Sequence, residues 1–126
     1  MVMLTKDFSV KEFRCRCCNG IPREDLCRPL AEALQELRDL IEGEIGEHPI
    51  IVNCGYRCQW HNTEVGGSPN SQHLRGLAAD IRVDGLKPVE VARFAEQIEA
   101  FKSSGIGIYK TFVHLDIGRK VPWRRK

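Results

Sequence analysis

Two short segments each contain a histidine followed by an aspartate, residue types that bind metal ions or transfer protons. The first reads Ser-Gln-His-Leu-Arg-Gly-Leu-Ala-Ala-Asp and places His73 seven residues before Asp80. The second reads Phe-Val-His-Leu-Asp-Ile-Gly and places His114 and Asp116 at alternate positions. Because alternate residues of a strand share a face, His114 and Asp116 should point the same way if this segment is a strand.

Two histidines and one carboxylate, with a position left for water, form the ligand set of a catalytic zinc site. His73, His114 and one aspartate could therefore bind one Zn²⁺ per chain. Two neutral imidazoles and one carboxylate leave the ion with net positive charge, which lowers the pKa of a bound water from ~16 toward ~7. The alternative is that these are ordinary surface or core residues.

Further segments resemble a known family. The pattern of His73, Asp80 and His114 resembles the zinc peptidases that include D-alanyl-D-alanine carboxypeptidases, L-alanyl-D-glutamate endopeptidases and vancomycin-resistance dipeptidases, the peptidase M15 family. The zinc domain of hedgehog proteins is similar in fold. Cys-Gly-Tyr-Arg-Cys-Gln-Trp-His-Asn at residues 54–62 and Val-Gly-Gly-Ser-Pro-Asn-Ser-Gln-His at residues 65–73 extend the likeness.

This resemblance implies that His73, Asp80 and His114 are the ligands of one Zn²⁺ per chain. It implies a zinc metallopeptidase, a hydrolase of peptide bonds in peptidoglycan stem peptides or cross-links in the cell wall. It leaves open whether the enzyme is a carboxypeptidase or an endopeptidase. It also implies that Arg57 is catalytic and faces a substrate carbonyl or carboxylate, where a guanidinium suits an anionic tetrahedral state. Ser71, Tyr56 and Gln72 are expected to contact substrate. A surface salt bridge for Arg57 and a turn cap for Ser71 are the alternatives.

The general base is where the chain departs from the family pattern. Many family members carry Glu or Asp three residues before the second histidine, and Thr111 stands there in this chain. Asp116 is the nearest replacement, about 6.5–7 Å along the strand face from His114, and we predict it as the base. Alternatively, Asp116 orients a ligand. The departure also keeps open a non-catalytic zinc-binding recognition module of the same fold.

The hydrophobic pattern predicts an α+β fold, a small antiparallel β-sheet with flanking helices like that of the hedgehog/DD-peptidase fold. Apolar spacing and flanking Gly and Pro predict helices at residues 25–42, 59–65 and 87–101 and strands at residues 49–53, 78–83, 105–109 and 112–117. The last two strands are expected to form an antiparallel hairpin because a two-residue connection joins them.

Length and composition predict one domain over residues 1–126, expected to be a monomer. Hydrophobic residues make up 42% and charged residues 29%, as in ordinary globular proteins. No apolar run reaches the ~20 residues of a membrane span, and no signal peptide is recognised. We expect synthesis in the cytoplasm, followed by lysis or export by a route that the sequence does not show.

Both ends of the chain have unusual composition. Residues 1–27 are expected to be an irregular, cysteine-rich arm with one short helical turn after Ser9. Residues 119–126 form a basic tail with five positive charges and no acid. The tail is expected to be a solvated terminus, or alternatively to attract an anionic polymer. No nucleic-acid binding is expected, because Trp123 is the only aromatic residue in the tail.

The six cysteines leave three states open. Reduced thiols are the leading expectation, because stable disulfides are typical of secreted proteins. One or more disulfides are the second possibility. A second metal bound by Cys15, Cys17, Cys18 and Cys27 is the third, although this spacing is not that of a usual zinc finger. Cys54 and Cys58 are expected to be small buried side chains that fill space in the core.

The other two histidines are not expected to act in the site. His61 is expected near the cleft at most, and His48 in a surface loop.

Overall fold

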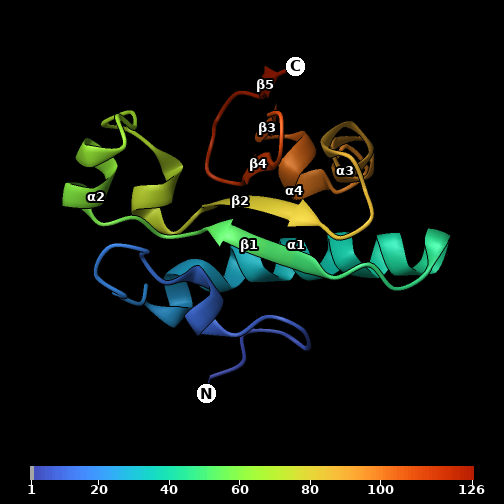
Figure 1. The fold of residues 1–126 in the computed structure, drawn as a ribbon, viewed down its shortest axis with the longest axis horizontal. Coiled ribbons are helices and arrows are strands. Elements are labelled where there is room, and N and C mark those ends of the chain that lie inside the picture. The colour runs from blue at the N-terminus through green and yellow to red at the C-terminus, as the bar shows by residue number, and fades with distance from the viewer. Residues whose placement is uncertain (1) are drawn as a thin grey trace.

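The computed structural model of the protein describes residues 2–126, a five-stranded sheet packed with helices (Figure 1). Its elements in chain order are η1 (Val10–Phe13), α1 (Glu24–Ile45), β1 (Ile50–Cys54), α2 (Gln59–Glu64), η2 (Gln72–Arg75), β2 (Ala78–Val83), α3 (Pro88–Ala95), α4 (Glu99–Lys102), β3 (Gly105–Ile108), β4 (Val113–Asp116) and β5 (Trp123–Arg125), η denoting a 3-10 helix. Across residues 2–126, no helix is long and apolar enough to span a bilayer.

Helix α1 forms where the apolar spacing predicted it, and it is longer at its C-terminal end. Leu30, Leu34 and Ile41 lie on one face and are fully or nearly fully buried. Gly43 does not end the helix, because its backbone keeps helical geometry up to Ile45. The helix ends at Gly46, whose φ of 93° is a conformation that glycine adopts without steric cost.

The single helix predicted at residues 87–101 is wrong. Two shorter helices, α3 and α4, replace it, and Ile98 between them has extended backbone geometry with φ −98° and ψ 113°. Ile98 and Phe101 are both buried, at 4% and 0% exposure. The break therefore changes the direction of the chain while both side chains stay in the core.

The strand order in the sheet is β1-β2-β4-β3-β5. The first four strands pair antiparallel, and the predicted hairpin of β3 and β4 is confirmed. The fifth strand departs from the expectation of an antiparallel sheet, because β5 pairs parallel with β3. The class of the fold, α+β with flanking helices, is as predicted.

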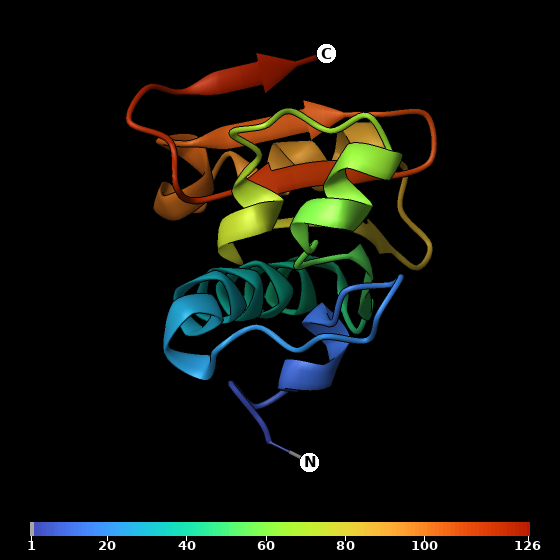
Figure 2. The same ribbon diagram turned by 90° about the vertical axis from the view of Figure 1, so that its left-hand side faces the viewer.

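The two faces of the sheet differ in chemistry because successive side chains of a strand alternate between them. Ile81 of β2 and Leu115 of β4 are fully buried in the hydrophobic core, against which α1 and α3 pack. Asp80, His114 and Asp116 occupy the intervening positions and lie on the opposite face. Figure 2 shows α2 and η2 on that opposite side of the strands, and α3 and α4 behind them.

The N-terminal arm packs against the domain more closely than the expectation of an irregular segment implied. Phe8 and Phe13 are 0% and 1% exposed and belong to the core. The predicted short turn is η1, where the backbone N–H of Ser9 donates to Glu12 Oε2 at 2.6 Å. Residue Met1 lies outside the described residues.

The basic tail is not a solvated terminus over its whole length. Trp123 begins β5, and its backbone N–H donates to the carbonyl of Ser104 at 2.8 Å. Arg124 donates to both carboxylate oxygens of Glu96, at 2.8 and 2.9 Å. The charge pattern alone did not predict this strand, because the partners that stabilise it, Ser104 and Glu96, are distant in sequence.

Candidate metal centre

Three predicted ligands converge in the structure, and we call His73, Asp80 and His114 the histidine centre. The antiparallel pairing of β2 with β4 places Asp80 directly opposite His114. Asp80 Oδ1 lies 3.1 Å from His114 Nδ1 and 3.3 Å from His73 Nε2. His73 arrives from η2, and its side chain is 2% exposed. Three atoms of the types that bind zinc therefore face one another.

The remaining nitrogen of each imidazole has its own acceptor. His73 Nδ1 lies 2.7 Å from the carbonyl oxygen of Gly55, and His114 Nε2 lies 2.7 Å from Asp116 Oδ2. A carbonyl or carboxylate oxygen accepts, so both of these nitrogens donate. In their neutral form the rings present their lone pairs toward Asp80, and hydrogen bonds from the outer nitrogens are typical of metal-binding histidines. The donor set fits a metal ion.

The charges of the centre are strongly coupled. Burial would raise the pKa of Asp80, yet the hydrogen bonds and charges of His114 and His73 outweigh it and hold this pKa well below its usual range. Burial would lower the pKa of each imidazole, yet the nearby carboxylates and, for His73, Cys54 raise both. Asp80 is therefore ionised and favours the protonated form of both imidazoles, and a bound cation would compete with those protons.

Asp116 lies behind His114, away from the cleft. Its side chain is 0% exposed and accepts hydrogen bonds from Ser104 Oγ and, at 2.9 Å, from Arg119 Nε, besides His114. A Cβ on Gly105, its neighbour on β3, would collide with this carboxylate. Burial would raise the pKa of Asp116, but the three donors lower it. This geometry supports the ligand-orienting alternative over the base, and both remain predictions.

A cleft of about 430 Å³ opens over the histidine centre. Arg57, Ser71 and Gln72 line it together with the three predicted ligands, so the structure brings these six residues together. Tyr56 does not line this cleft, contrary to expectation, and instead borders a separate depression beside Pro22. Tyr56 and Arg57 therefore border different depressions although they are adjacent in sequence.

Arg57 lines the cleft, and its buried Nε has no hydrogen-bond partner. Its backbone N–H donates to the carbonyl of His73 at 3.1 Å, and its side chain donates to Ser71 Oγ at 3.1 Å. A buried, unpaired donor is costly to a protein unless a ligand satisfies it. Ser71 Oγ also accepts from the backbone of His73, so the cap alternative for Ser71 is observed as well.

Sequence reasoning missed two cleft residues in the tail. Trp123 lies edge-on to the ring of His114, with the centroids 5.6 Å apart. The guanidinium of Arg119 stacks over Trp123 at 4.6 Å while it donates to Asp116. Gly107 leaves room for the indole, since a Cβ there would lie 2.9 Å from it. Trp123 could have been singled out in the sequence as the lone aromatic residue in a basic run, but only the pairing of β5 reveals its position.

Tyr109 and Phe112, whose rings are stacked with their centroids 4.5 Å apart, also line the cleft.

Cys54 lies beside the histidine centre, where sequence reasoning expected a filler. A β-bulge after Val52 places Cys54 opposite Asp80. Cys54, His73 and Asp80 offer ligand atoms within 4.8 Å of one another. However, the thiol lies 3.9 Å from His73 Nδ1, the nitrogen that already donates to a carbonyl. We therefore keep His114 as the third predicted ligand.

The other two histidines lie away from the centre. His61 does not line the cleft, and its Nδ1 lies 3.4 Å from Cys15 Sγ. His48 contacts the carbonyl of Asp84 at 2.7 Å near the surface, as expected of a loop residue.

Comparisons with known proteins agree with these residues. The sequence model of the family described as Peptidase M15 matches residues 6–116. The chain is 34% identical over 82 residues to a Haemophilus influenzae protein named probable peptidoglycan L,D-endopeptidase MepK, covering 60% of this chain and 42% of that protein. It is 49% identical over 37 residues to the zinc D-Ala-D-Ala carboxypeptidase of Streptomyces albus G, covering 29% of this chain and 14% of that protein. The chain thus spans less than half the length of either curated relative.

Proposed function

This chain belongs to the peptidase M15 family, and we propose that it is a zinc-dependent peptidase acting on peptidoglycan stem peptides or cross-links. The observation that carries the proposal is the convergence of His73, Asp80 and His114 at the floor of a cleft. The names of the two relatives support peptidoglycan as the substrate class.

We assign the metal to His73 Nε2, Asp80 Oδ1 and His114 Nδ1, the atoms that face one another. Zn²⁺ held there would supply a Lewis acid for the peptide carbonyl and would lower the pKa of water to about 7. Gly55 and Asp116 fix the two imidazoles by accepting from their outer nitrogens. Fixed rings hold their lone pairs in place without relying on the metal itself.

Arg57 is the residue that we assign to the substrate. Its buried, unpaired Nε and its partly used terminal nitrogens form a fork of donors at the cleft edge. A guanidinium in that position binds a carbonyl or carboxylate oxygen and stabilises the negative charge that develops there. Ser71 orients the guanidinium by accepting from it at 3.1 Å, and Gln72 lines the same wall.

A second candidate function is a zinc-binding recognition module without catalysis. Thr111 borders a different depression from the cleft, on the far side of Phe112. Among the described residues that line the cleft, Asp80 is the only carboxylate, and it is assigned to the metal. Asp116 is fully buried and does not line the cleft, which argues against it as the acceptor of a proton from water there. The absence of a free cleft carboxylate is the observation that favours this second function.

Digestion of purified peptidoglycan by the zinc-loaded protein tests both candidates, with products identified by mass spectrometry. Loss of a terminal D-alanine would indicate a carboxypeptidase, and opening of cross-linked dimers or cleavage within a stem would indicate an endopeptidase. The Asp80→Ala protein is the control for contaminating hydrolases. If the wild-type protein binds zinc and peptidoglycan but yields no product, the peptidase proposal fails and the recognition module stands.

A further inference from the structure

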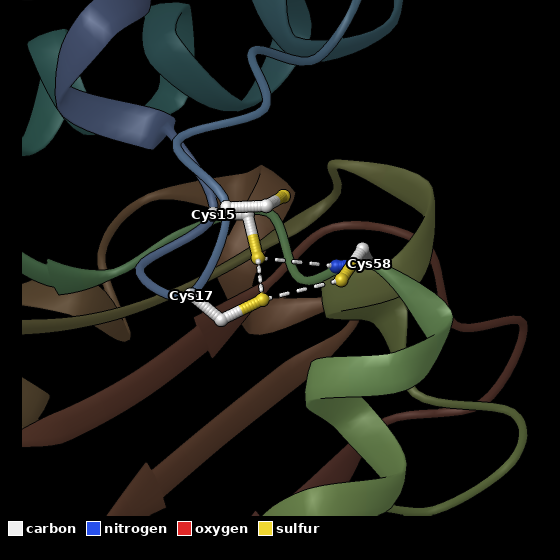
Figure 3. A group of neighbouring side chains, drawn as sticks. Cys15, Cys17 and Cys58 are labelled. Carbon is white, nitrogen blue, oxygen red and sulfur yellow. Dashed lines mark hydrogen bonds between the residues drawn. The ribbon is translucent and has the colours of Figure 1, made fainter.

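We propose that Cys15, Cys17, Cys18 and Cys58 bind a second, structural zinc ion, separate from the histidine centre and independent of the proposed peptidase activity. The four sulfur atoms all lie within 4.8 Å of one another. Cys17 Sγ lies 3.4 Å from Cys15 Sγ and 3.4 Å from Cys58 Sγ. Figure 3 shows the side chains of Cys15, Cys17 and Cys58 pointing toward one another. We call these four residues the cysteine cluster.

The spacing of the sulfur atoms matches a tetrahedral zinc site. Four thiolates at a Zn–S distance of about 2.3 Å place neighbouring sulfurs about 3.8 Å apart. The two 3.4 Å separations around Cys17 are slightly shorter than this value, so a zinc ion would need only a small outward shift of the sulfurs. Four cysteines are a complete structural ligand set, with no position left for water.

The loop that carries three of the cysteines is closed by its own backbone. Cys15 N–H donates to the carbonyl of Gly20 at 2.8 Å, and Asn19 N–H donates to the carbonyl of Cys15 at 2.8 Å. Asn19 adopts a φ of 59°, the left-handed conformation that reverses the chain. A Cβ on Gly20 would lie 3.2 Å from Cys18 Sγ, so glycine permits the close approach. This turn gathers Cys15, Cys17 and Cys18 on one side.

Backbone donors surround the sulfur atoms as they do in metal–thiolate sites. Cys15 Sγ accepts from the backbone of Cys58, Cys58 Sγ from His61, and Cys18 Sγ from Gly20, each at 3.4 Å. His61 Nδ1 also lies 3.4 Å from Cys15 Sγ. Such hydrogen bonds stabilise the thiolate form, which is the form that binds a metal.

The fourth ligand differs from the one that sequence spacing offered. Cys27 was grouped with Cys15, Cys17 and Cys18, but it lies in α1, is 0% exposed and is not part of the cluster. Cys58 takes its place because the segment after β1 returns to the arm, where Tyr56 N–H donates to the carbonyl of Phe13 at 2.9 Å. A buried thiol such as Cys27 packs as a small apolar side chain.

A single disulfide would account for the cluster less well than a metal. All six cysteines are unpaired in the described residues. Cys17 Sγ lies equally close to the sulfurs of Cys15 and Cys58, and one disulfide bond would leave two thiols of the cluster without a role. One metal ion explains why the four sulfur atoms lie together, three of them from the loop and one from the residue before α2.

The cluster would tie the N-terminal arm to the wall of the cleft. Cys58 directly follows Arg57, whose backbone N–H donates to His73 and whose side chain donates to Ser71. None of the four cysteines lines the cleft itself. A zinc ion there would therefore hold the segment that carries Arg57, and it would act on structure and not on the reacting bond.

Metal content of the full-length protein, purified under reducing conditions and loaded with zinc, tests the proposal. We expect about two zinc ions per chain in the wild type and about one in both Asp80→Ala and the double variant Cys17→Ser, Cys58→Ser. Cys27→Ala is the matched control, a cysteine outside the cluster, and should retain about two. A second measurement replaces zinc with Co²⁺ in the Asp80→Ala protein, where intense sulfur-to-cobalt charge-transfer absorption is expected.

The cobalt spectrum keeps the test decisive if the double cysteine variant fails to fold, because Asp80→Ala leaves the cluster intact. A wild type that binds about one zinc, with no thiolate absorption in cobalt-loaded Asp80→Ala, would overturn the proposal. Iron in place of zinc would overturn the assignment of the metal, and a disulfide among the four cysteines in freshly reduced, zinc-loaded protein would overturn the site. None of these outcomes depends on peptidase activity.

Discussion

The histidine centre and the cysteine cluster are built on different kinds of backbone. Asp80 and His114 stand on paired central strands, so the ladder of hydrogen bonds fixes their distance before any metal binds. Cys17 and Cys18 stand on an exposed loop, and their sulfurs are held together by a few weak contacts. The first centre opens onto a cleft, and the second does not.

The two sites therefore depend on the fold in different ways. A site that does chemistry benefits from ligands that are already in place and from one open coordination position. A site that stabilises a loop gains its order from the ion, so metal binding there is part of folding. The same chain would therefore use one metal for reaction and another for attachment of its N-terminal arm.

Asp80→Ala is expected to have the largest effect, because it should remove zinc from one site and leave the other occupied. Removing the carboxylate shared by both imidazoles should release the zinc of the histidine centre and abolish hydrolysis, while the cysteine cluster keeps its ion. Elemental analysis and peptidoglycan digestion measure the two effects. Asp84→Ala, which removes an exposed carboxylate just beyond the same strand, is the matched control and should change neither. Retention of both zinc ions in Asp80→Ala would remove Asp80 from the ligand set.

Arg57→Ala tests whether a cleft residue can affect turnover without affecting metal binding. We expect turnover to fall by roughly 10²–10³ with zinc content unchanged, because one donor to the developing negative charge is lost. Steady-state kinetics on a stem peptide, with metal analysis of the same sample, measure this. Arg93→Ala removes an exposed arginine of α3 that does not line the cleft, and it should behave as wild type. Wild-type turnover in Arg57→Ala would leave Arg57 a structural residue only.

Asp116→Asn asks whether the histidine centre depends on the residue behind it. An amide cannot accept from His114, Ser104 and Arg119 as a carboxylate does. We expect zinc affinity to fall by about 10–100-fold, the usual effect of losing a partner that orients a metal ligand. Competition with a chelator of known affinity measures it. Unchanged affinity with turnover reduced by ~10² would instead identify Asp116 as the general base.

The smallest effect is expected from Gly105→Ala, which tests the packing behind the histidine centre. The added Cβ would collide with the carboxylate of Asp116, so we expect the free energy of unfolding to fall by about 1–3 kcal/mol. Urea denaturation measures it. Gly43→Ala in α1 is the matched control, since nothing lies within 4 Å of its added Cβ, and it should stabilise the protein by about 0.5–1 kcal/mol. Equal stability of the two variants would show that the space at Gly105 is not required.

Local patterns were sufficient for much of the fold. The apolar spacing of α1 and the alternation in β2 and β4 predicted these elements, because a helix or strand repeats its buried positions at a fixed period. Alternation also predicted that His114 and Asp116 share a face, and they contact each other at 2.7 Å. The division of residues 87–101 into α3 and α4 was not predicted, since both helices continue one apolar pattern.

By itself, the sequence determined the residue types, their short-range spacing and the motifs that indicate the family. The tertiary structure alone decided that Cys58 and not Cys27 joins the cysteine cluster, and that Trp123 enters the cleft while Tyr56 leaves it. Each of these outcomes depends on contacts between segments far apart in the chain, such as the parallel pairing of β3 with β5. Periodicity carries no information on which distant segments meet, because that is set by the packing of the whole core.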